Sequence, residues 1–273
     1  MPINKNATQL RATIISNRRL GAYHQLIIEI GDLVKQVRPG NFIAVSVGGE
    51  FSMMVLRRAF AISRINDRGT IELIISPFGS GSRWLCSLPE GSFLDVVVPL
   101  GTSFGIPTEP VAALLVGGGY GSAPLFGLAE VLKNRGCRVI MALGASSAAK
   151  IYAPIEGKRA ATLLKIFTED GSAGEIGRVT DSLAEMIQEH DIRVIYSCGP
   201  MAMLEAVSEI ASSADIAHQA AVEESMACGV GICMTCIVPS KDANGEIKNL
   251  RSCIEGPVMH GEAVQWHLVG KQI

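Results

Sequence analysis

The sequence predicts a multi-domain protein that combines an antiparallel β-barrel, a parallel α/β domain and a small, cysteine-rich C-terminal subdomain. Up to residue 98, short apolar runs alternate with polar residues, as in antiparallel strands. From residue 111, continuous apolar runs alternate with helical patterns, as in parallel sheets. Four of the seven cysteines then lie between residues 228 and 253. We expect the three parts to occupy residues 1–107, 108–220 and 221–273.

The composition fits about two domains with an appendage and excludes several classes of function. The chain has 273 residues, of which 48% are hydrophobic. Its 24 basic and 26 acidic residues leave a formal charge of −2 and form no long block of one sign, which argues against nucleic-acid or membrane binding. Residues 1–16 lack the features of a secretory signal, and no apolar run can span a bilayer. We therefore expect a reducing, cytoplasmic location.

The predicted barrel consists of six short strands separated by glycine, proline and Asn-Asp breaks. A short helix interrupts it, beginning at Gly81 and ending before Pro89, because proline cannot continue a helix. The predicted strands are Ala12–Ser16, His24–Ile30, Phe42–Val47, Ala59–Ile65, Ile71–Ser76 and Phe93–Val98.

The predicted α/β domain begins with Val111–Val116, a continuous apolar run typical of a strand that is buried on both faces. This run leads into a glycine-rich turn and a helix, and the alternation that follows predicts a parallel sheet. The further predicted elements are the helices Pro124–Asn134 and Asp181–His190, a helix after Pro200, and the strands Arg138–Leu143, Leu163–Thr168 and Arg193–Ser197.

The C-terminal cysteines have the spacing of an iron–sulfur ligand set. They form C-x4-C-x2-C with a fourth thiol after sixteen residues, which is the plant-type [2Fe–2S] pattern. Small residues in the first loop leave room for backbone N–H groups to point at sulfur. A structural zinc site is one alternative, although zinc sites usually draw on two C-x2-C pairs, and chance clustering of buried cysteines is another. The predicted ligands are Cys228, Cys233, Cys236 and Cys253.

The glycine-rich turn after the first α/β strand predicts a pyrophosphate site. It follows a strand and opens a helix, so backbone N–H groups and the positive end of the helix dipole face the same point. Glycines can also serve merely for a tight turn, but a second strand end meets a helix start at Tyr196–Met201, and two such edges form a nucleotide crevice. The predicted nucleotide-binding residues are Gly117, Gly118, Gly119, Gly121, Ser122, Gly199, Pro200 and Met201.

Cys198 lies at the second of these edges, where a thiol can contact a nicotinamide ring and help to position it for hydride transfer. A small buried residue without a catalytic role is the competing interpretation. Cys86 and Cys137 carry no motif and are expected in the core.

In the barrel, Arg58 and the start of the predicted short helix form a second candidate anion site. A guanidinium next to a helix N-terminus is suited to hold a diphosphate. Paired arginines on a strand, such as Arg57 and Arg58, are also common on solvated faces, which is the competing interpretation.

In the order of its parts and in its motifs, the chain resembles the ferredoxin reductase superfamily and, within it, most closely the electron-transfer subunits of class 1B dihydroorotate dehydrogenases. The resemblance spans nearly the whole chain. Its most specific parts are residues 223–236, EESMACGVGICMTC, and residues 253–258, CIEGPV. Supporting matches lie at residues 99–101, 117–124, 168–172 and 197–201.

The resemblance implies FAD as a cofactor, together with a [2Fe–2S] cluster and NAD(H). The family binds FAD through an Arg-Pro-x-Ser motif, whose arginine is present as Arg58, while Ala59 and Ala61 replace its proline and serine. Ile75 and Ser76 stand where relatives have a Tyr-Arg pair. Backbone N–H groups are expected to replace the lost side-chain contacts. The implied flavin contacts are Arg58, Ala59, Phe60, Ala61, Ile75, Ser76, Pro77, Gly79, Gly81 and Ser82.

The resemblance further implies an oxidoreductase subunit of pyrimidine biosynthesis. In the family, a catalytic FMN flavoprotein oxidises dihydroorotate to orotate and passes electrons through the cluster and FAD to NAD⁺, and a heterotetramer of the two subunits is expected. The first alternative is a similar subunit of a hydrogenase, sulfite reductase or transhydrogenase, and the second is a zinc-binding nucleotide sensor. NADH is favoured over NADPH because residues 143–147 contain no arginine to meet a 2′-phosphate.

Apolar side chains in the cysteine loop predict where a partner docks. Val230, Ile232 and Met234 would form an exposed apolar patch of a kind that monomers usually avoid. We expect a second protein to cover them, and packing against the barrel is the alternative for one or two of them.

Overall fold

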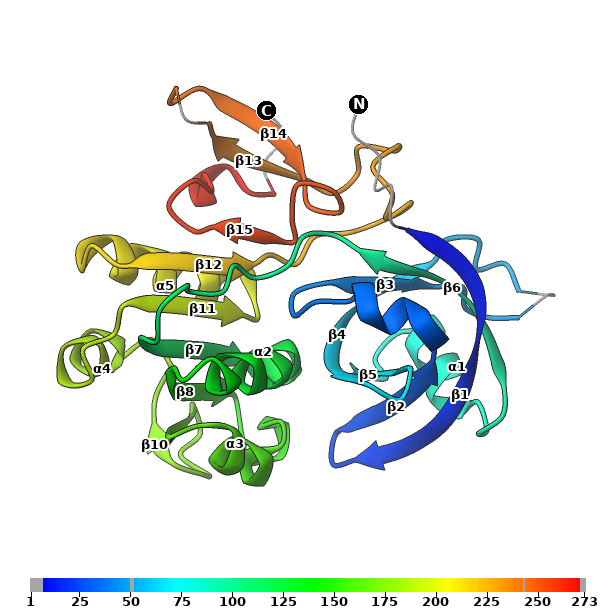
Figure 1. Cartoon of the computed structure of the whole chain (residues 1–273), viewed down its shortest axis with the longest axis horizontal. Coiled ribbons are helices and arrows are strands. Elements are labelled where there is room, and N and C mark those ends of the chain that lie inside the picture. Colours follow the sequence, from blue (N-terminus) through cyan, green and yellow to red (C-terminus); the bar gives the residue numbers. More distant parts are fainter. Residues whose placement is uncertain (1–6, 50–51, 243, 271–273) are drawn as a thin grey trace.

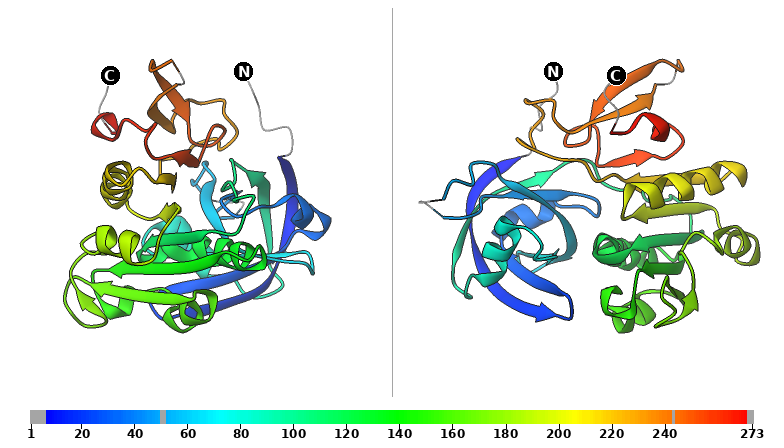
Figure 2. Two further views of the ribbon diagram at one scale, coloured as in Figure 1. Left: turned by 60° about the vertical axis from the view of Figure 1, so that its left-hand side comes forward. Right: turned by 180° about the vertical axis from the view of Figure 1, so that it is seen from behind.

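The computed structural model describes residues 7–49, 52–242 and 244–270, and in it a β-barrel lies beside an α/β domain (Figure 1). The C-terminal segment lies across one end of both, as the turned views also show (Figure 2). The predicted combination of barrel, α/β domain and C-terminal subdomain is therefore confirmed. No helix in the described ranges is long and apolar enough to cross a membrane.

Six antiparallel strands close the barrel: β1 (Thr8–Leu20), β2 (Tyr23–Glu29), β3 (Phe42–Val45), β4 (Arg58–Asn66), β5 (Thr70–Ile75) and β6 (Phe93–Leu100). Their order is β1-β2-β5-β4-β3-β6. Alternate residues such as Leu26 and Ile28 of β2 point inward and are fully buried. β1 extends beyond its predicted end at Ser16, because hairpin pairing with β2 holds the polar stretch up to Leu20 in strand conformation.

The short helix α1 (Ser80–Ser87) packs on the barrel core through Leu85, which is fully buried. It begins one residue earlier than predicted. At its N-terminus the backbone N–H of Gly79 donates to Ser82 Oγ at 3.0 Å. At its C-terminus Asn17 Nδ2 lies 2.8 to 3.3 Å from three carbonyl oxygens, which satisfies groups that a helix end leaves unpaired. Both ends of α1 are thereby fixed on the barrel.

A seven-stranded sheet forms the α/β domain, with the order β10-β9-β8-β7-β11-β12-β15. Neighbouring strands from β10 to β12 are parallel, as predicted, whereas β15 pairs antiparallel with β12. Sequence reasoning missed this edge strand because three residues are too few to show a period. The strands are β7 (Ala112–Gly118), β8 (Arg138–Ala145), β9 (Leu163–Thr168), β10 (Glu175–Ile176), β11 (Val194–Cys198), β12 (Ala217–Ala221) and β15 (Val258–His260).

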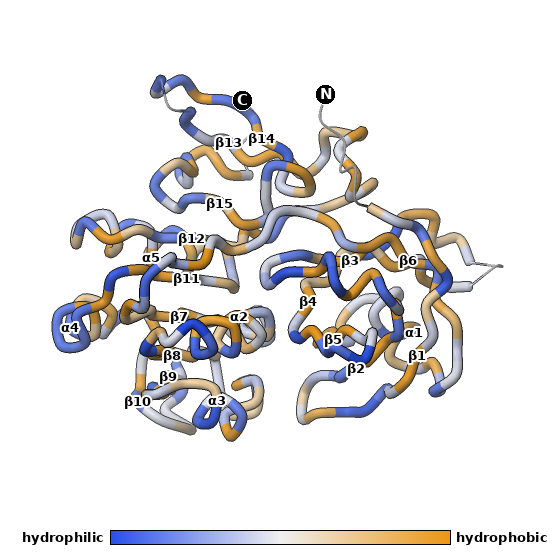
Figure 3. Tube along the Cα trace, viewed as in Figure 1, coloured by the Kyte–Doolittle hydropathy of each residue, from blue (hydrophilic) through white to orange (hydrophobic). Residues whose placement is uncertain are grey.

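Helices cover both faces of this sheet. On one face α2 (Ala123–Asn134) and α3 (Pro154–Ala160) cover Leu115 of β7, and on the other face α4 (Leu183–Glu189) and α5 (Met201–Ser213) cover its neighbour Leu114. Burial on both faces explains the continuous apolar run of β7 (Figure 3). Sequence reasoning did not predict α3, β10 or β12. Short 3-10 helices lie at Gly31–Gln36, Gly119–Ser122, Ala148–Lys150 and Trp266–Leu268.

The C-terminal segment is attached to both other parts. Its strands β13 (Ile237–Lys241) and β14 (Ile247–Arg251) form a two-stranded sheet, while β15 extends the α/β sheet. Toward the barrel, Cys236 and Cys253 pack against Phe42, Ala44 and Leu100. The cysteine-bearing loops therefore lie directly on the barrel.

The barrel and the α/β domain also contact each other closely. A Cβ at Gly127 of α2 would lie 2.6 Å from the carbonyl oxygen of Ser63 in β4, so only glycine permits this approach. Ser63 Oγ donates to the carbonyl oxygen of Ala123 at 3.0 Å, and the Tyr23 hydroxyl donates to that of Lys150 at 2.8 Å. These contacts hold the barrel opposite the C-terminal ends of β7 and β11 (Figure 1).

Candidate functional site

A cavity of about 380 Å³ lies where the barrel, the C-terminal ends of β7 and β11 and the segment after β12 meet. Its volume is typical of small-molecule sites. The barrel contributes Arg58–Ala61 and Gly79–Ser82, and the α/β domain contributes Tyr120, Gly121 and the pair Cys198–Gly199. The two anion sites predicted separately from the sequence therefore face one space.

Arg58 stands at the start of β4, beside the N-terminus of α1. Its Nη1 donates to the carbonyl oxygen of Leu56 at 2.7 Å, and its Nε lies 3.5 Å from the position that a Cβ on Gly81 would occupy. Glycine at position 81 thus lets the guanidinium approach the first turn of the helix. The adjacent Arg57 instead pairs with Asp95 at 2.7 Å. The guanidinium of Arg58 and the end of α1 together suit a diphosphate.

The other predicted flavin contacts are divided between the cavity and the barrel core. Ala59, Phe60, Ala61 and Ser76 line the cavity. Ile75 does not, because successive residues of a strand point to opposite sides and its side chain is buried in the barrel core. Its neighbour Ile74 lines the cavity instead. Pro77 lies between the lining residues Ser76 and Phe78 without lining the cavity itself.

The two predicted nucleotide loops touch each other through glycines. β11 pairs with β7 along its length, so both strand ends reach the same edge. A Cβ at Gly121 would lie 2.8 Å from Gly199 Cα, and one at Gly118 would lie 2.7 Å from Pro200 Cδ. The two loops therefore form one wall, of which Gly121 and Gly199 face the cavity. The predicted residues that shape the turns without lining the cavity are Gly117, Gly118, Gly119, Ser122, Pro200 and Met201.

Cys198, Tyr120 and Glu223 form the polar part of the inner wall. Burial raises the pKa of the Cys198 thiol to about 12 and the pKa of Tyr120 to about 12. Burial also raises the pKa of Glu223, whose carboxyl group hydrogen-bonds with Tyr120. The thiol and the phenol therefore stay protonated at neutral pH. A wall built from a ring, a neutral thiol and hydrogen-bonding groups suits a planar heterocycle.

The four predicted cluster ligands lie in two pairs. Hydrogen bonding with Cys253 lowers the pKa of Cys236 to about 5, and the pKa of Cys253 rises in turn. Cys233 accepts a hydrogen bond from Thr235 Oγ1 at 3.2 Å, and this bond, together with its interaction with Cys228, lowers the pKa of Cys233 to about 6. Within the described ranges, no three His, Cys, Asp or Glu side chains are placed to hold a single metal ion. Two adjacent thiol pairs fit a cluster of two irons bound by four thiolates.

The first cysteine loop folds as the sequence predicted. The backbone N–H groups of Val230 and Ile232 point at Cys228 Sγ, at 3.4 and 3.3 Å. Gly229 and Gly231 make this possible with φ angles of 69° and 86°, which residues other than glycine rarely adopt. N–H groups directed at sulfur favour the thiolate and tune a bound cluster.

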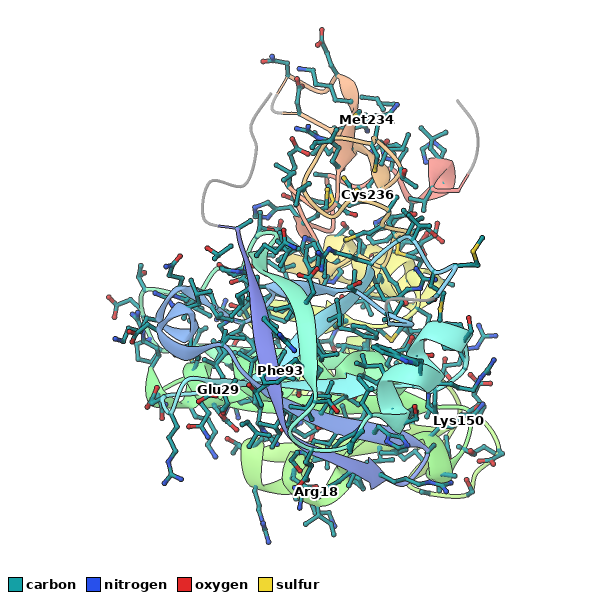
Figure 4. The ribbon with its side chains drawn as sticks, turned by 90° about the vertical axis from the view of Figure 1, so that its right-hand side faces the viewer. Arg18, Glu29, Phe93, Lys150, Met234 and Cys236 are labelled. Carbon is teal, nitrogen blue, oxygen red and sulfur yellow. The ribbon has the colours of Figure 1, made fainter. Side chains whose placement is uncertain are left out.

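The tip of the same loop is exposed. Val230 packs against the barrel cluster around Phe42, so the alternative interpretation of self-packing is correct for this residue. Ile232, however, is 71% exposed and Met234 is 42% exposed. Figure 4 shows Met234 near the outer end of the subdomain with Cys236 below it. Cys233 is exposed as well, so one predicted ligand lies at the surface.

Sequence reasoning missed a third wall of the cavity, which consists of the segment after β12 and part of the barrel. Phe42 and Met226 line the cavity and also pack against Cys236 and Cys253. One layer of side chains therefore separates the cavity from two predicted cluster ligands. Tyr120 also lines the cavity and was not predicted, although an aromatic residue within the glycine turn was a sequence signal that could have identified it. The remaining lining residues that were not predicted are Gly40, Ile74, Phe78, Ala123, Pro124, Ala221, Val222, Glu223, Glu224 and Pro257.

Two family models match the chain. The iron–sulfur cluster binding domain of dihydroorotate dehydrogenase B matches residues 223–265, which contain all four cysteines. The oxidoreductase NAD-binding domain matches residues 115–209, which contain both glycine loops.

Among solved structures, the NADH-dependent reduced ferredoxin-NADP oxidoreductase superimposes with a TM-score of 0.82 at 25% identity, over 93% of this chain and 90% of that chain. An Amycolatopsis cytochrome P450 reductase superimposes with a TM-score of 0.61 at 22% identity, over 76% and 66% of the two chains, and shares the fold.

Curated relatives are similar over most of their length. The electron transfer subunit of dihydroorotate dehydrogenase B from Listeria monocytogenes is 36% identical over 88% of this chain and 92% of its own. The corresponding subunit from Caldanaerobacter subterraneus is 33% identical over 94% and 98%. Because identity of this level extends over nearly both full lengths, the chain belongs to the family of dihydroorotate dehydrogenase B electron transfer subunits.

Proposed function

We propose that this chain is the electron-transfer subunit of a dihydroorotate dehydrogenase complex and that it carries electrons between a catalytic partner and NAD(H) in pyrimidine biosynthesis. The observation that carries the proposal is the position of Phe42 and Met226, which contact both the cavity and two cluster cysteines. Electron transfer between two cofactors requires that they lie close together. A flavin in the cavity and a cluster on the four cysteines would be neighbours in this arrangement.

Each part of the chain has its own task in this proposal. Arg58 and the N-terminus of α1 hold the FAD diphosphate, while Gly121 and Gly199 admit the pyrophosphate and nicotinamide of NAD(H) and Cys198 positions the nicotinamide. When bound, FAD exchanges a hydride with NAD(H) and single electrons with the cluster, which is chemistry that amino-acid side chains do not supply. Residues 1–107 bind FAD, residues 108–220 bind NAD(H) and residues 221–273 bind the cluster.

The partner in this proposal is a catalytic flavoprotein that contains FMN and docks over the exposed tip of the cysteine loop. The name of the relatives, electron transfer subunit, supports a complex with a catalytic subunit. The exposure of Ile232 and Met234, next to the exposed ligand Cys233, supports this docking position. A heterotetramer of the two subunits is the expected assembly.

The test is to purify the chain with and without a class 1B catalytic subunit. We expect the complex to reduce NAD⁺ with dihydroorotate, and the chain alone to oxidise NADH only with an artificial acceptor. Absorption spectra should show a flavin and a [2Fe–2S] cluster. A colourless, zinc-containing protein would support the nucleotide sensor instead. A coloured protein that forms no complex with that subunit would support a hydrogenase, sulfite reductase or transhydrogenase partner.

A further inference from the structure

Arg251 is a buried cation beside the cluster cysteines. It is the last residue of β14, and only 7% of its side chain is exposed. A guanidinium is costly to remove from water unless its donors are paired with good geometry. The hydrogen-bond partners of the Arg251 guanidinium therefore indicate its role in the fold.

All three arms of the Arg251 guanidinium are bonded. Nη1 donates to the carbonyl oxygen of Gly231 at 2.9 Å, while Nε and Nη2 donate to the two carboxylate oxygens of Glu255 at 3.2 and 2.5 Å. Glu255 also accepts the backbone N–H of Arg251 at 2.8 Å. The bidentate pair fixes the orientation of the guanidinium. The remaining arm ties down the loop between Cys228 and Cys233.

The other two cysteines are held close to the same group. The N–H of Ser252, which follows Arg251, donates to the carbonyl oxygen of Cys236 at 2.8 Å, and Cys253 comes next in the chain. In the first loop, a Cβ at Gly231 would lie 2.5 Å from Ile254 Cγ1, so this loop fits tightly against the turn after Cys253. The segments that carry all four ligands thus meet at Arg251.

The guanidinium also lies among the segments that carry the cluster cysteines. Arg251 precedes Cys253 by two residues, and its Nη1 bonds to the carbonyl oxygen of Gly231 in the loop between Cys228 and Cys233. A fixed positive charge in a poorly solvated site stabilises nearby negative charge. Reduction adds one electron, and therefore one negative charge, to a cluster on these thiolates.

We propose that Arg251 is a positioning residue for the cluster: it holds the ligand-bearing segments together and raises the reduction potential of the cluster, while the Glu255 carboxylate opposes the charge effect. This inference rests on the proposed function, because it requires a [2Fe–2S] cluster on the four cysteines. Lysine would preserve the charge but could not form the bidentate pair and the bond to Gly231 together.

The test compares Arg251→Gln, Arg251→Lys and Glu255→Gln in the full chain. Lys248→Gln is the matched control, because it removes one positive charge from the same strand at a side chain that is 54% exposed and bonded to Asp242. The measurements are iron and sulfide per chain and the midpoint potential of the cluster in a redox titration. We expect a shift to lower potential in Arg251→Gln and to higher potential in Glu255→Gln. Arg251→Lys should keep the wild-type potential but retain less cluster, and the control should match the wild type in both.

Opposite shifts in the two neutral variants would not arise from a purely structural role. Equal potentials in Arg251→Gln and Lys248→Gln would overturn the inference. If Arg251→Gln retains no cluster, Glu255→Gln decides, and an unchanged or lowered potential there would overturn it equally. A wild-type chain without a [2Fe–2S] spectrum would refute the proposed function itself, which separates the two failures.

Discussion

Adjacent residues in this chain have different roles that only their surroundings distinguish. Arg57 pairs with Asp95, whereas Arg58 faces the cavity beside α1. Ile74 lines the cavity, whereas Ile75 is buried in the barrel core. These differences allow tests in which a neighbouring residue of the same type serves as the control.

Replacing Arg58 by alanine should weaken FAD binding by about a hundredfold or more. The reason is that loss of a charge-assisted bidentate contact to a phosphate costs about 3 kcal/mol. A calorimetric titration of the apoprotein with FAD measures the change. Arg57→Ala is the control, since Arg57 pairs with Asp95. Equal losses in the two variants would show that the diphosphate does not lie at Arg58.

Replacing Cys253 by serine should abolish or strongly reduce cluster content, because the pair with Cys236 would then lack one thiolate. Iron and sulfide analysis together with the visible spectrum measures this. Cys86→Ser is the control, because Cys86 packs beside the barrel core and burial raises its pKa to about 11. The ligand assignment would be wrong if the Cys253 variant kept its full iron content.

At the scale of elements, the short strand β15 joins the cysteine-bearing segment to the α/β sheet through β12. The seam between β12 and β15 contains His218 of β12, whose Nε2 lies 2.7 Å from Ser197 Oγ. A Cβ at Gly261 would lie only 2.2 Å from His218 Nδ1, so the imidazole is tightly enclosed. Close packing around a titratable ring makes this seam sensitive to pH.

The folded chain should become less stable as the pH is lowered from about 6.5 to 4. The reason is that burial lowers the pKa of His218 to about 4. The unfolded chain, with a pKa of about 6.5, takes up the proton first. The contribution of His218 is therefore fully present above pH 6.5 and is lost progressively down to pH 4, by about 3 kcal/mol in total. Urea unfolding at several pH values should show a weaker dependence in His218→Gln than in the wild type. Parallel curves would argue against this role.

At the scale of the whole molecule, the three parts are useful only together. The cavity takes its walls from the barrel, the α/β domain and the segment after β12, and it shares Phe42 and Met226 with the cysteine cluster. The cysteine loop then leads from this shared layer to the surface at Ile232. The cavity, the cysteine cluster and the exposed tip therefore follow one another in the order expected for an electron-transfer path to a partner protein.

Replacing Ile232 by aspartate should slow electron transfer between this chain and its partner by about tenfold or more, because a charge would be placed in an apolar contact. Oxidation of NADH by an artificial acceptor should be unchanged. Stopped-flow reduction of the complex and steady-state assays of the isolated chain measure the two rates. Ile247→Asp is the control, since Ile247 is also exposed but lies on β14. A parallel decrease of both rates in Ile232→Asp would show that the loop is structural and that the partner docks elsewhere.

The sequence by itself determined the order of the three parts, and it predicted the four cysteines as cluster ligands and both glycine- and arginine-containing loops as anion sites. Each of these depends on spacing within a short segment, such as C-x4-C-x2-C or a glycine turn between a strand and a helix. Local spacing constrains backbone geometry directly, so it can be recognised without a fold.

Only the tertiary structure decided which side chains complete the site. The layer formed by Phe42 and Met226, the antiparallel pairing of β15 and the bonds of Arg251 to Gly231 and Glu255 join segments that are far apart or too short to show a pattern. The choice of Ile74 over Ile75 depends on which side of β5 faces the cavity. These features arise from the packing of one part against another, and a linear pattern carries no information about that packing.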